Sequence, residues 1–173
     1  NLVDAHYGGQ IQDRANPGVP AEATVKVTYS DKIVTFNDGY KVVLRKPTFE
    51  LTNLGYGELE TNTRLSPRVA NQMIGIGLLE MISETDIVAN ADPDDQDNDG
   101  ISGEANYVWD VTAEKSVLGR FGWKAGQPSL RQQNAGAFNG DIGLTSSLFP
   151  EESCTEIQTD CANQISGASI DEG

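Results

Sequence analysis

The pattern of apolar and polar positions changes once along the chain, near residue 66. Between about residues 23 and 52 apolar and polar side chains alternate, most clearly over 24–29 and 40–44. Alternation with a period of two is typical of half-buried strands, and Asn37-Asp38-Gly39 is a turn sequence. The pattern predicts a β-meander of short antiparallel strands over about 23–52, packed on one face, within a β-rich insertion that spans 23–59.

Beyond residue 66 the apolar positions follow helical spacing, first over 66–82 and then over 128–138. Ser66 suits the N-cap of the first helix, and Pro67 suits its first position, where a missing N–H costs nothing. A single helical turn is expected near 113–118. Because strands come first and helices follow, the order predicts an α+β fold with a helical part over 66–165.

Composition limits the classes of partner. The 173 residues are enough for one domain with a core of its own. Only 12 Lys and Arg stand against 26 Asp and Glu, a net charge of −14, which argues against nucleic-acid or anionic-membrane binding. No apolar run approaches the roughly 20 residues that a membrane span requires. An acidic protein attracts cations, so a divalent metal is the first partner to consider.

An acidic loop over residues 92–106 has Asp at every second position just before Gly100. The pattern D-x-D-x-D-G is typical of a loop that wraps a calcium ion, because it supplies several oxygens and a sharp turn. At position twelve, where an EF-hand has a bidentate Glu, the chain has Asn106. A solvated acidic turn and a magnesium site are the alternatives. The predicted calcium ligands are the side chains of Asp95, Asp97, Asp99 and Glu104 and the carbonyl of Ile101.

The chain has two cysteines and one histidine, His6, and it contains no C-x-x-C-H haem-attachment motif. So few soft ligands cannot form a zinc site. Cys154 and Cys161 enclose a short acidic loop. They form a structural disulfide in an oxidising compartment, two free thiols, or a redox-active pair. The first is favoured, because redox-active cysteines usually stand closer together and near positive charge.

The segment 119–133 is rich in aromatic and basic residues. Trp123 stands near Arg120 and Lys124, which fits a cation–π cluster or an anion site for a carboxylated ligand. Alternatively, Phe121 and Trp123 fill the core while the cations stay on the surface.

Several stretches together resemble one known family. They are YGGQIQDRA at 7–15, PGVP at 17–20, IGIGLLE at 74–80, DGISG at 99–103, and the segments 119–141 and 145–150, followed by the two cysteines. These stretches resemble the di-haem oxidoreductases, secreted or periplasmic proteins in which they lie between two C-x-x-C-H motifs. The resemblance implies that the chain is an internal segment of a larger di-haem c-type cytochrome. Its partners would be the haem-bearing segments of the parent chain, which carry haem c, and an electron donor that the sequence does not identify.

A more distant resemblance is to the bacterial di-haem cytochrome c peroxidases. Those proteins have a Trp, a Leu seven residues later, a Gln three further on and then a Glu-led triplet, and Trp123, Leu130 and Gln133 keep this spacing. Asp141 stands near the place of the Glu. The resemblance implies a peroxidase-like helical part, Trp123 as an electron relay between haems, and Gln133 and Asp141 facing the peroxide-binding haem. Imidazole also suits iron, which makes His6 a conceivable ligand.

Two functions follow from these features. The first is a part of a periplasmic or secreted di-haem oxidoreductase that transfers electrons and has peroxidase-type activity, colourless and inactive as this segment alone. The alternative is a calcium-stabilised, non-catalytic binding or structural module. A hydrolase is disfavoured, because a Ser/His/Asp set would have to use His6, the one histidine.

Overall fold

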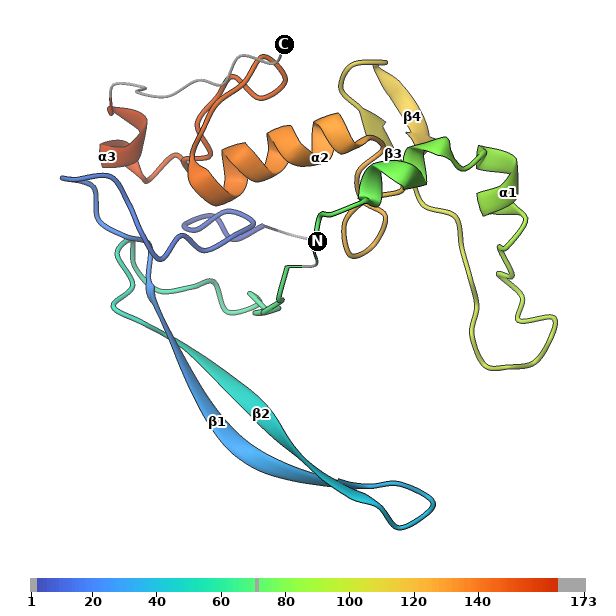
Figure 1. Ribbon diagram of the computed structural model, residues 1–173. Coiled ribbons are helices and arrows are strands. Elements are labelled where there is room, and N and C mark those ends of the chain that lie inside the picture. Colours follow the sequence, from blue (N-terminus) through green and yellow to red (C-terminus); the bar gives the residue numbers. More distant parts are fainter. Residues whose placement is uncertain (1–2, 71, 165–173) are drawn as a thin grey trace. The chain divides into compact units, whose positions relative to one another are not determined.

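The computed structural model describes residues 3–70 and 72–164 (Figure 1). The chain forms two compact units. Unit 1 comprises Asn1–Val69 and Ser153–Ile165, and unit 2 comprises Ala70–Glu152 and Ser166–Gly173. Two small antiparallel sheets and several short helices confirm the α+β class, while the cytochrome-c-peroxidase-like helical part stays a prediction. The elements are β1 (Thr24–Thr35), β2 (Lys41–Thr52), the 3-10 helix η1 (Ile76–Met81), α1 (Glu84–Val88), β3 (Tyr107–Asp110), β4 (Lys115–Leu118), α2 (Leu130–Ala137), the π-helix η2 (Phe138–Ile142) and α3 (Thr159–Ala162).

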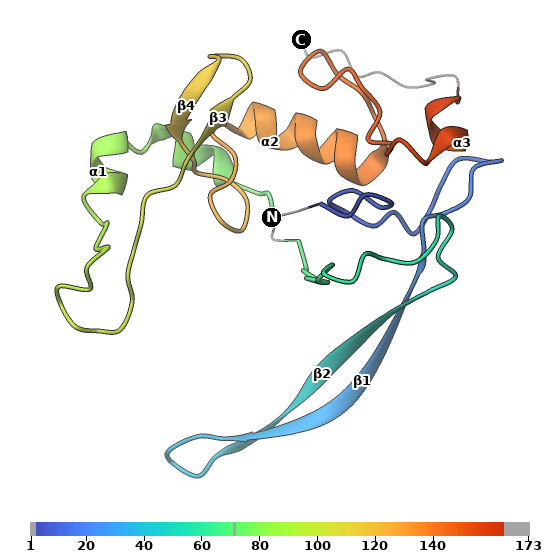
Figure 2. The same cartoon turned by 180° about the vertical axis from the view of Figure 1, so that it is seen from behind.

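The β-rich region of unit 1 is one long hairpin, so the prediction of a meander of short strands was wrong. β1 pairs with β2 along all 12 residues of each strand, from Thr24 opposite Thr52 to Thr35 opposite Lys41. The predicted turn at Asn37-Asp38-Gly39 is confirmed: Gly39 adopts a φ of 84°, and the Phe36 and Tyr40 rings stack beside it. Figures 1 and 2 show the hairpin as a twisted ribbon that projects from its unit.

The rest of unit 1 joins the N-terminal segment to the C-terminal one. The carbonyl of His6 accepts hydrogen bonds from Thr155 Oγ1 and Gln158 Nε2, both at 3.1 Å. Both donors lie in the loop that a disulfide between Cys154 and Cys161 closes, so the predicted disulfide is confirmed and the two cysteines are not free thiols. The disulfide therefore supports the contact between the two ends of the unit.

The prediction of a long helix over 66–82 was wrong. The described residues before Ile76 form no helix, and η1 covers only Ile76–Met81. Gly75 adopts a left-handed φ of 79°, which interrupts any continuous helix at that point. The apolar side chains that the helical pattern predicted to be buried are exposed, and Ile74 is 91% exposed. The segment therefore lacks the tertiary packing that stabilises most helices. The next helix, α1, instead begins after Ser83, whose hydroxyl accepts from the Asp86 N–H.

The hairpin of unit 2 corrects another prediction. β3 pairs with β4 in antiparallel fashion, so residues 115–118 are a strand and not part of a helical turn. The Asp110 carboxylate fixes the turn between them by accepting from the N–H groups of Thr112 and Ala113. The second predicted helix is confirmed as α2, which Ser129 caps by accepting from the Gln132 N–H, and it continues into η2.

The apolar core is smaller than expected for a chain of 173 residues. In the described part of the chain the buried apolar side chains are those of Tyr7 and Ala23 in unit 1 and of Leu118, Phe121, Pro128 and Ala135 in unit 2. Many large apolar side chains are exposed, among them Val69 and Met81. None of the described helices has the length and hydropathy of a membrane span.

Candidate functional site

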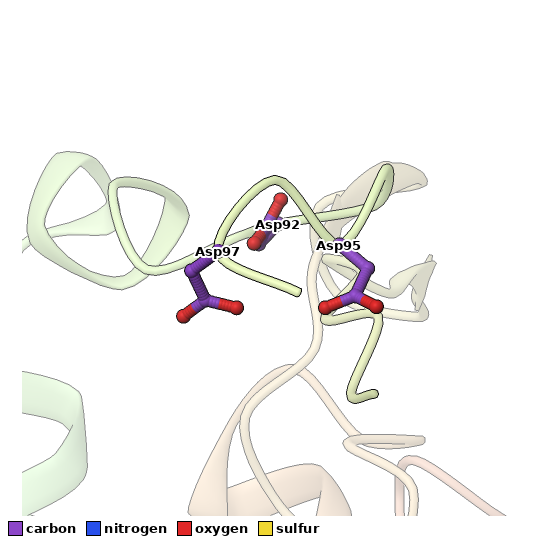
Figure 3. Close-up of side chains that lie close together, drawn as sticks. All are labelled: Asp92, Asp95 and Asp97. Atoms are coloured by element: carbon purple, nitrogen blue, oxygen red, sulfur yellow. The ribbon is translucent and has the colours of Figure 1, made fainter. Parts of the chain in front are cut away.

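The acidic loop brings three carboxylates together. One oxygen of each of Asp92, Asp95 and Asp97 lies within 4.8 Å of the others (Figure 3). Two features of the backbone shape the loop. Asp92 and Gly103 exchange N–H···O bonds of 2.9 and 3.0 Å that close its base, and Asp95 adopts a φ of 49°. Three oxygens on one short loop are a donor set that suits a hard cation.

Two of the four predicted carboxylate ligands of calcium belong to this cluster, and the other two, Asp99 and Glu104, do not. Asp95 and Asp97 belong to the cluster, whereas the Asp99 carboxylate accepts from the Ile101 N–H at 2.8 Å. Glu104 lines a small hollow beside Ile87, Asn90 and Ala91. Sequence reasoning missed Asp92, whose two oxygens both accept from the Gln96 N–H at 2.9 Å.

The aromatic segment forms a closed loop over residues 119–127. Gln127 accepts at its carbonyl from the N–H groups of Arg120 and Phe121 and donates its own N–H to Phe121. A side chain at Gly119 would place its Cβ only 1.9 Å from the Ala125 carbonyl oxygen, so the closure requires glycine there. Phe121 is buried and anchors the loop, whereas Trp123 is 58% exposed. The alternative in which Phe121 and Trp123 both fill the core is therefore wrong for Trp123.

The two basic residues beside Trp123 differ in their surroundings. The Arg120 guanidinium donates from Nη1 to the carbonyls of Leu79 and Ile82, at 2.8 and 2.6 Å. It thereby satisfies carbonyl groups at the end of η1. Lys124 is exposed, and its carbonyl accepts from the Asn106 side chain. Of the two cations predicted to bind a carboxylated ligand or cofactor, Lys124 is the more exposed.

The helix after this loop carries the two predicted peroxidase residues. Gln133 lies in α2 with its Oε1 close to Gly122, where an added Cβ would stand 3.3 Å away. The structure therefore brings Gln133 against the loop that presents Trp123. Asp141 is exposed in η2, eight residues further on, which corresponds to about 12 Å along a helix.

Two residues in this region have roles that sequence reasoning missed. The buried Gln132 side chain accepts from the Val111 N–H and donates to Trp109 O and Gln127 Oε1, which ties α2 to β3 and to the aromatic loop. The Glu80 carboxylate accepts from the Leu130 N–H at 2.6 Å and so caps α2. The contacts of Gln132 with β3 and its following residue, and that of Glu80 with Leu130, join residues at least 21 apart in sequence, so no local pattern indicates them.

Unit 1 contains two buried carboxylates with opposite pKa shifts. Burial raises the pKa of Glu22, only partly offset by hydrogen bonds from the Gln12 N–H and Gln158 Nε2. Burial also acts to raise the pKa of Asp4. Hydrogen bonds from the Thr63 hydroxyl and from the N–H groups of Glu60, His6 and Tyr7 outweigh it, so the pKa of Asp4 is lowered. Asp4 and its four hydrogen-bond donors, called here the Asp4 cluster, hold the N-terminal segment against residues 60–63.

A family model described as "Di-haem oxidoreductase, putative peroxidase" matches residues 6–167. The chain belongs to the di-haem oxidoreductase family. The match spans both units and includes the acidic loop, the aromatic loop and the disulfide. No curated protein and no solved structure is significantly similar to the chain.

The donor groups of this chain do not fit the attachment of a family haem. Both cysteines are joined to each other, so neither thiol is free for a thioether bond. The one histidine, His6, has its Nδ1 2.8 Å from the Glu58 carbonyl oxygen, which leaves Nε2 as the ring nitrogen able to bind iron, but a histidine alone attaches no haem covalently. A covalent haem site would therefore need cysteines from outside this sequence.

Proposed function

We propose that the chain is part of a periplasmic or secreted di-haem c-type cytochrome oxidoreductase, with electron transfer and peroxidase activity in the complete protein. One observation carries this: the chain belongs to a di-haem family over residues 6–167 and yet has no C-x-x-C-H motif. The haems would be attached by other segments of the parent chain. The disulfide between Cys154 and Cys161 supports an oxidising compartment.

The exposed apolar surface supports the same proposal. In unit 2 Ile74, Leu78 and Met81 are largely exposed along η1 and the segment before it. A soluble domain rarely leaves so many large apolar side chains uncovered, and such surfaces usually mark interaction sites. Haem-bearing segments of the parent chain would cover them.

In this proposal the residues on the aromatic loop and on α2–η2 serve the peroxidase chemistry. When bound, the haem supplies the redox chemistry. Trp123 would provide an exposed aromatic ring between cofactors, and Lys124 a positive charge beside it. Gln133 would orient the ligand by hydrogen bonding, and Asp141 would hold and transfer a proton, which is the task of a general acid/base.

The parent gene product tests the proposal. The complete protein, isolated from a periplasmic fraction, should yield two haems per chain as pyridine haemochrome and should consume peroxide. This chain expressed alone should be colourless. A parent protein without haem would contradict the proposal, as would covalently bound haem in this chain by itself.

The acidic loop favours a second, compatible function as a calcium site. The cluster of Asp92, Asp95 and Asp97 supplies carboxylate oxygens, and Gly100 with a φ of 86° allows the sharp turn of the D-x-D-x-D-G pattern. Asp99, Glu104 and the Ile101 carbonyl remain proposed ligands that would complete the shell on binding. Without a cation the close carboxylates repel one another, so calcium would stabilise this loop.

Calcium should raise the melting temperature of this chain, and a chelator should reverse the rise. At 100 times the dissociation constant the gain is about 2.7 kcal/mol. Asp95→Asn should weaken binding by about 10-fold or more in calorimetry, because affinity depends on the number of charged ligands. Asp94→Asn, in the same loop but outside the cluster, is the matched control. Absence of both heat and a melting shift for the unaltered chain would exclude the site.

A further inference from the structure

The long hairpin of unit 1 has one apolar face and one largely polar face. In an antiparallel pair, directly opposite residues place their side chains on the same side. The register therefore collects Lys26 with Glu50, whose charges lie 3.2 Å apart, and the Thr28–Thr48 pair on the polar face. The other face, called here the apolar face, contains Val25, Val27, Tyr29, Ile33, Val43, Pro47, Phe49 and Leu51.

Much of the apolar face is exposed in the described part of the chain, most of all toward the turn of the hairpin. Tyr29, Ile33 and Val43 are 55%, 66% and 61% exposed. An isolated two-stranded hairpin is marginally stable in water, and an apolar surface of this kind usually marks an interface. The ribbon seen in Figures 1 and 2 therefore requires a partner on this face.

The one charged pair on the apolar face indicates what the partner is. Asp31 lies opposite Arg45 in the register, midway along the face, and the Arg45 guanidinium stacks 3.8 Å above the centre of the Tyr29 ring. Consider a second copy related by a two-fold axis that runs along the ribbon, with the two apolar faces in contact. β1 of each copy then lies over β2 of the other, so Asp31 of each copy meets Arg45 of its partner.

The charge of the hairpin also favours a second copy. Residues 24–52 contain five Lys or Arg and three Asp or Glu, whereas the whole chain carries −14. Two such acidic proteins repel each other over most of their surface. The hairpin lacks this acidic excess, so two copies can approach there at the least electrostatic cost.

We propose that two copies of this chain associate through the apolar faces of their hairpins, with reciprocal Asp31–Arg45 contacts across the interface. A strand of 12 residues is about 40 Å long, and a two-stranded face is about 10 Å wide. Each copy thus contributes on the order of 400 Å² of flat area. Interdigitating side chains bring the total buried surface near the roughly 1,000 Å² that a specific interface needs.

Charge reversal tests the proposal by sedimentation velocity, from about 1 to 100 μM. The unaltered chain should sediment as a dimer. Asp31→Arg alone and Arg45→Asp alone should each weaken self-association by at least about 100-fold, because each places like charges together across the interface. An equimolar mixture of the two variants should form a heterodimer, since the two arginines of one copy then face the two aspartates of the other.

The heterodimer is the decisive result, because a variant that merely unfolds cannot recover by mixing with another variant. Lys46→Glu, a charge reversal on the polar face, is the matched control and should leave the dimer intact. A monomer at every concentration for the unaltered chain would overturn the proposal. So would a dimer that the reversals at Asp31 and Arg45 do not affect, since that dimer would use another surface.

Discussion

Replacing Asp141 with Ala in the haem-bearing parent protein should lower peroxide turnover by on the order of 10²–10⁴-fold. The proposal makes Asp141 the residue that accepts and returns the proton during peroxide cleavage. Its place in η2 suits that role, because a π-helical turn at the end of an α-helix re-aims side chains and is frequent at functional sites. Steady-state turnover under saturating peroxide measures the effect.

Three further variants separate proton transfer from a structural role of Asp141. Asp141→Asn keeps the shape but carries no acidic proton, so it should lose as much activity as the Ala variant. Asp141→Glu should restore a large part, because a Glu can perform the same transfer. Glu152→Ala removes another exposed carboxylate of unit 2 and should have no effect. Full turnover in the Asn variant would reject the role of Asp141.

The hairpin shows which features of the fold the local sequence pattern could predict. Alternation located both strand regions and the turn, because period two and the Asn-Asp-Gly sequence are local signals. It did not show that each strand is continuous, because the polar residues around Asp31 have the composition of a turn. In the structure Asp31 is a strand residue opposite Arg45. Cross-strand pairing decides this, and pairing joins residues that are distant in sequence.

The helix predicted over 66–82 failed for a related reason. Apolar spacing indicates a helix only when its apolar face is covered, and Ile74 has no cover in the described chain.

The acidic loop was found from its Asp spacing, but Asp92 joins the cluster through the Asp92–Gly103 backbone pair, which no local pattern shows. Likewise, Arg120 had the charge of an anion site, and the structure uses it to bind carbonyl groups.

The second large effect concerns the stability of unit 1. Asp4→Asn should lower the free energy of unfolding by about 2–3 kcal/mol at neutral pH. Asp4 is 5% exposed, and its two carboxylate oxygens accept from four donors, two on each oxygen. An Asn amide has one acceptor oxygen, so its NH₂ group would face donors that then lose their partner. Urea unfolding with the disulfide intact measures the difference.

The pH dependence of this difference follows from the sign of the pKa shift. Because the folded-state pKa of Asp4 is lowered from its ordinary 3.8, the carboxylate stabilises the fold fully above that value. The stabilisation is lost as the pH falls through the folded-state pKa. The gap between the unaltered chain and Asp4→Asn should therefore be constant near neutrality and shrink below about pH 4. Asp13→Asn, which replaces an exposed carboxylate of the same unit, is the matched control and should unfold like the unaltered chain at neutral pH. Equal midpoints for Asp4→Asn and Asp13→Asn at neutral pH would show that the Asp4 cluster does not hold the unit together.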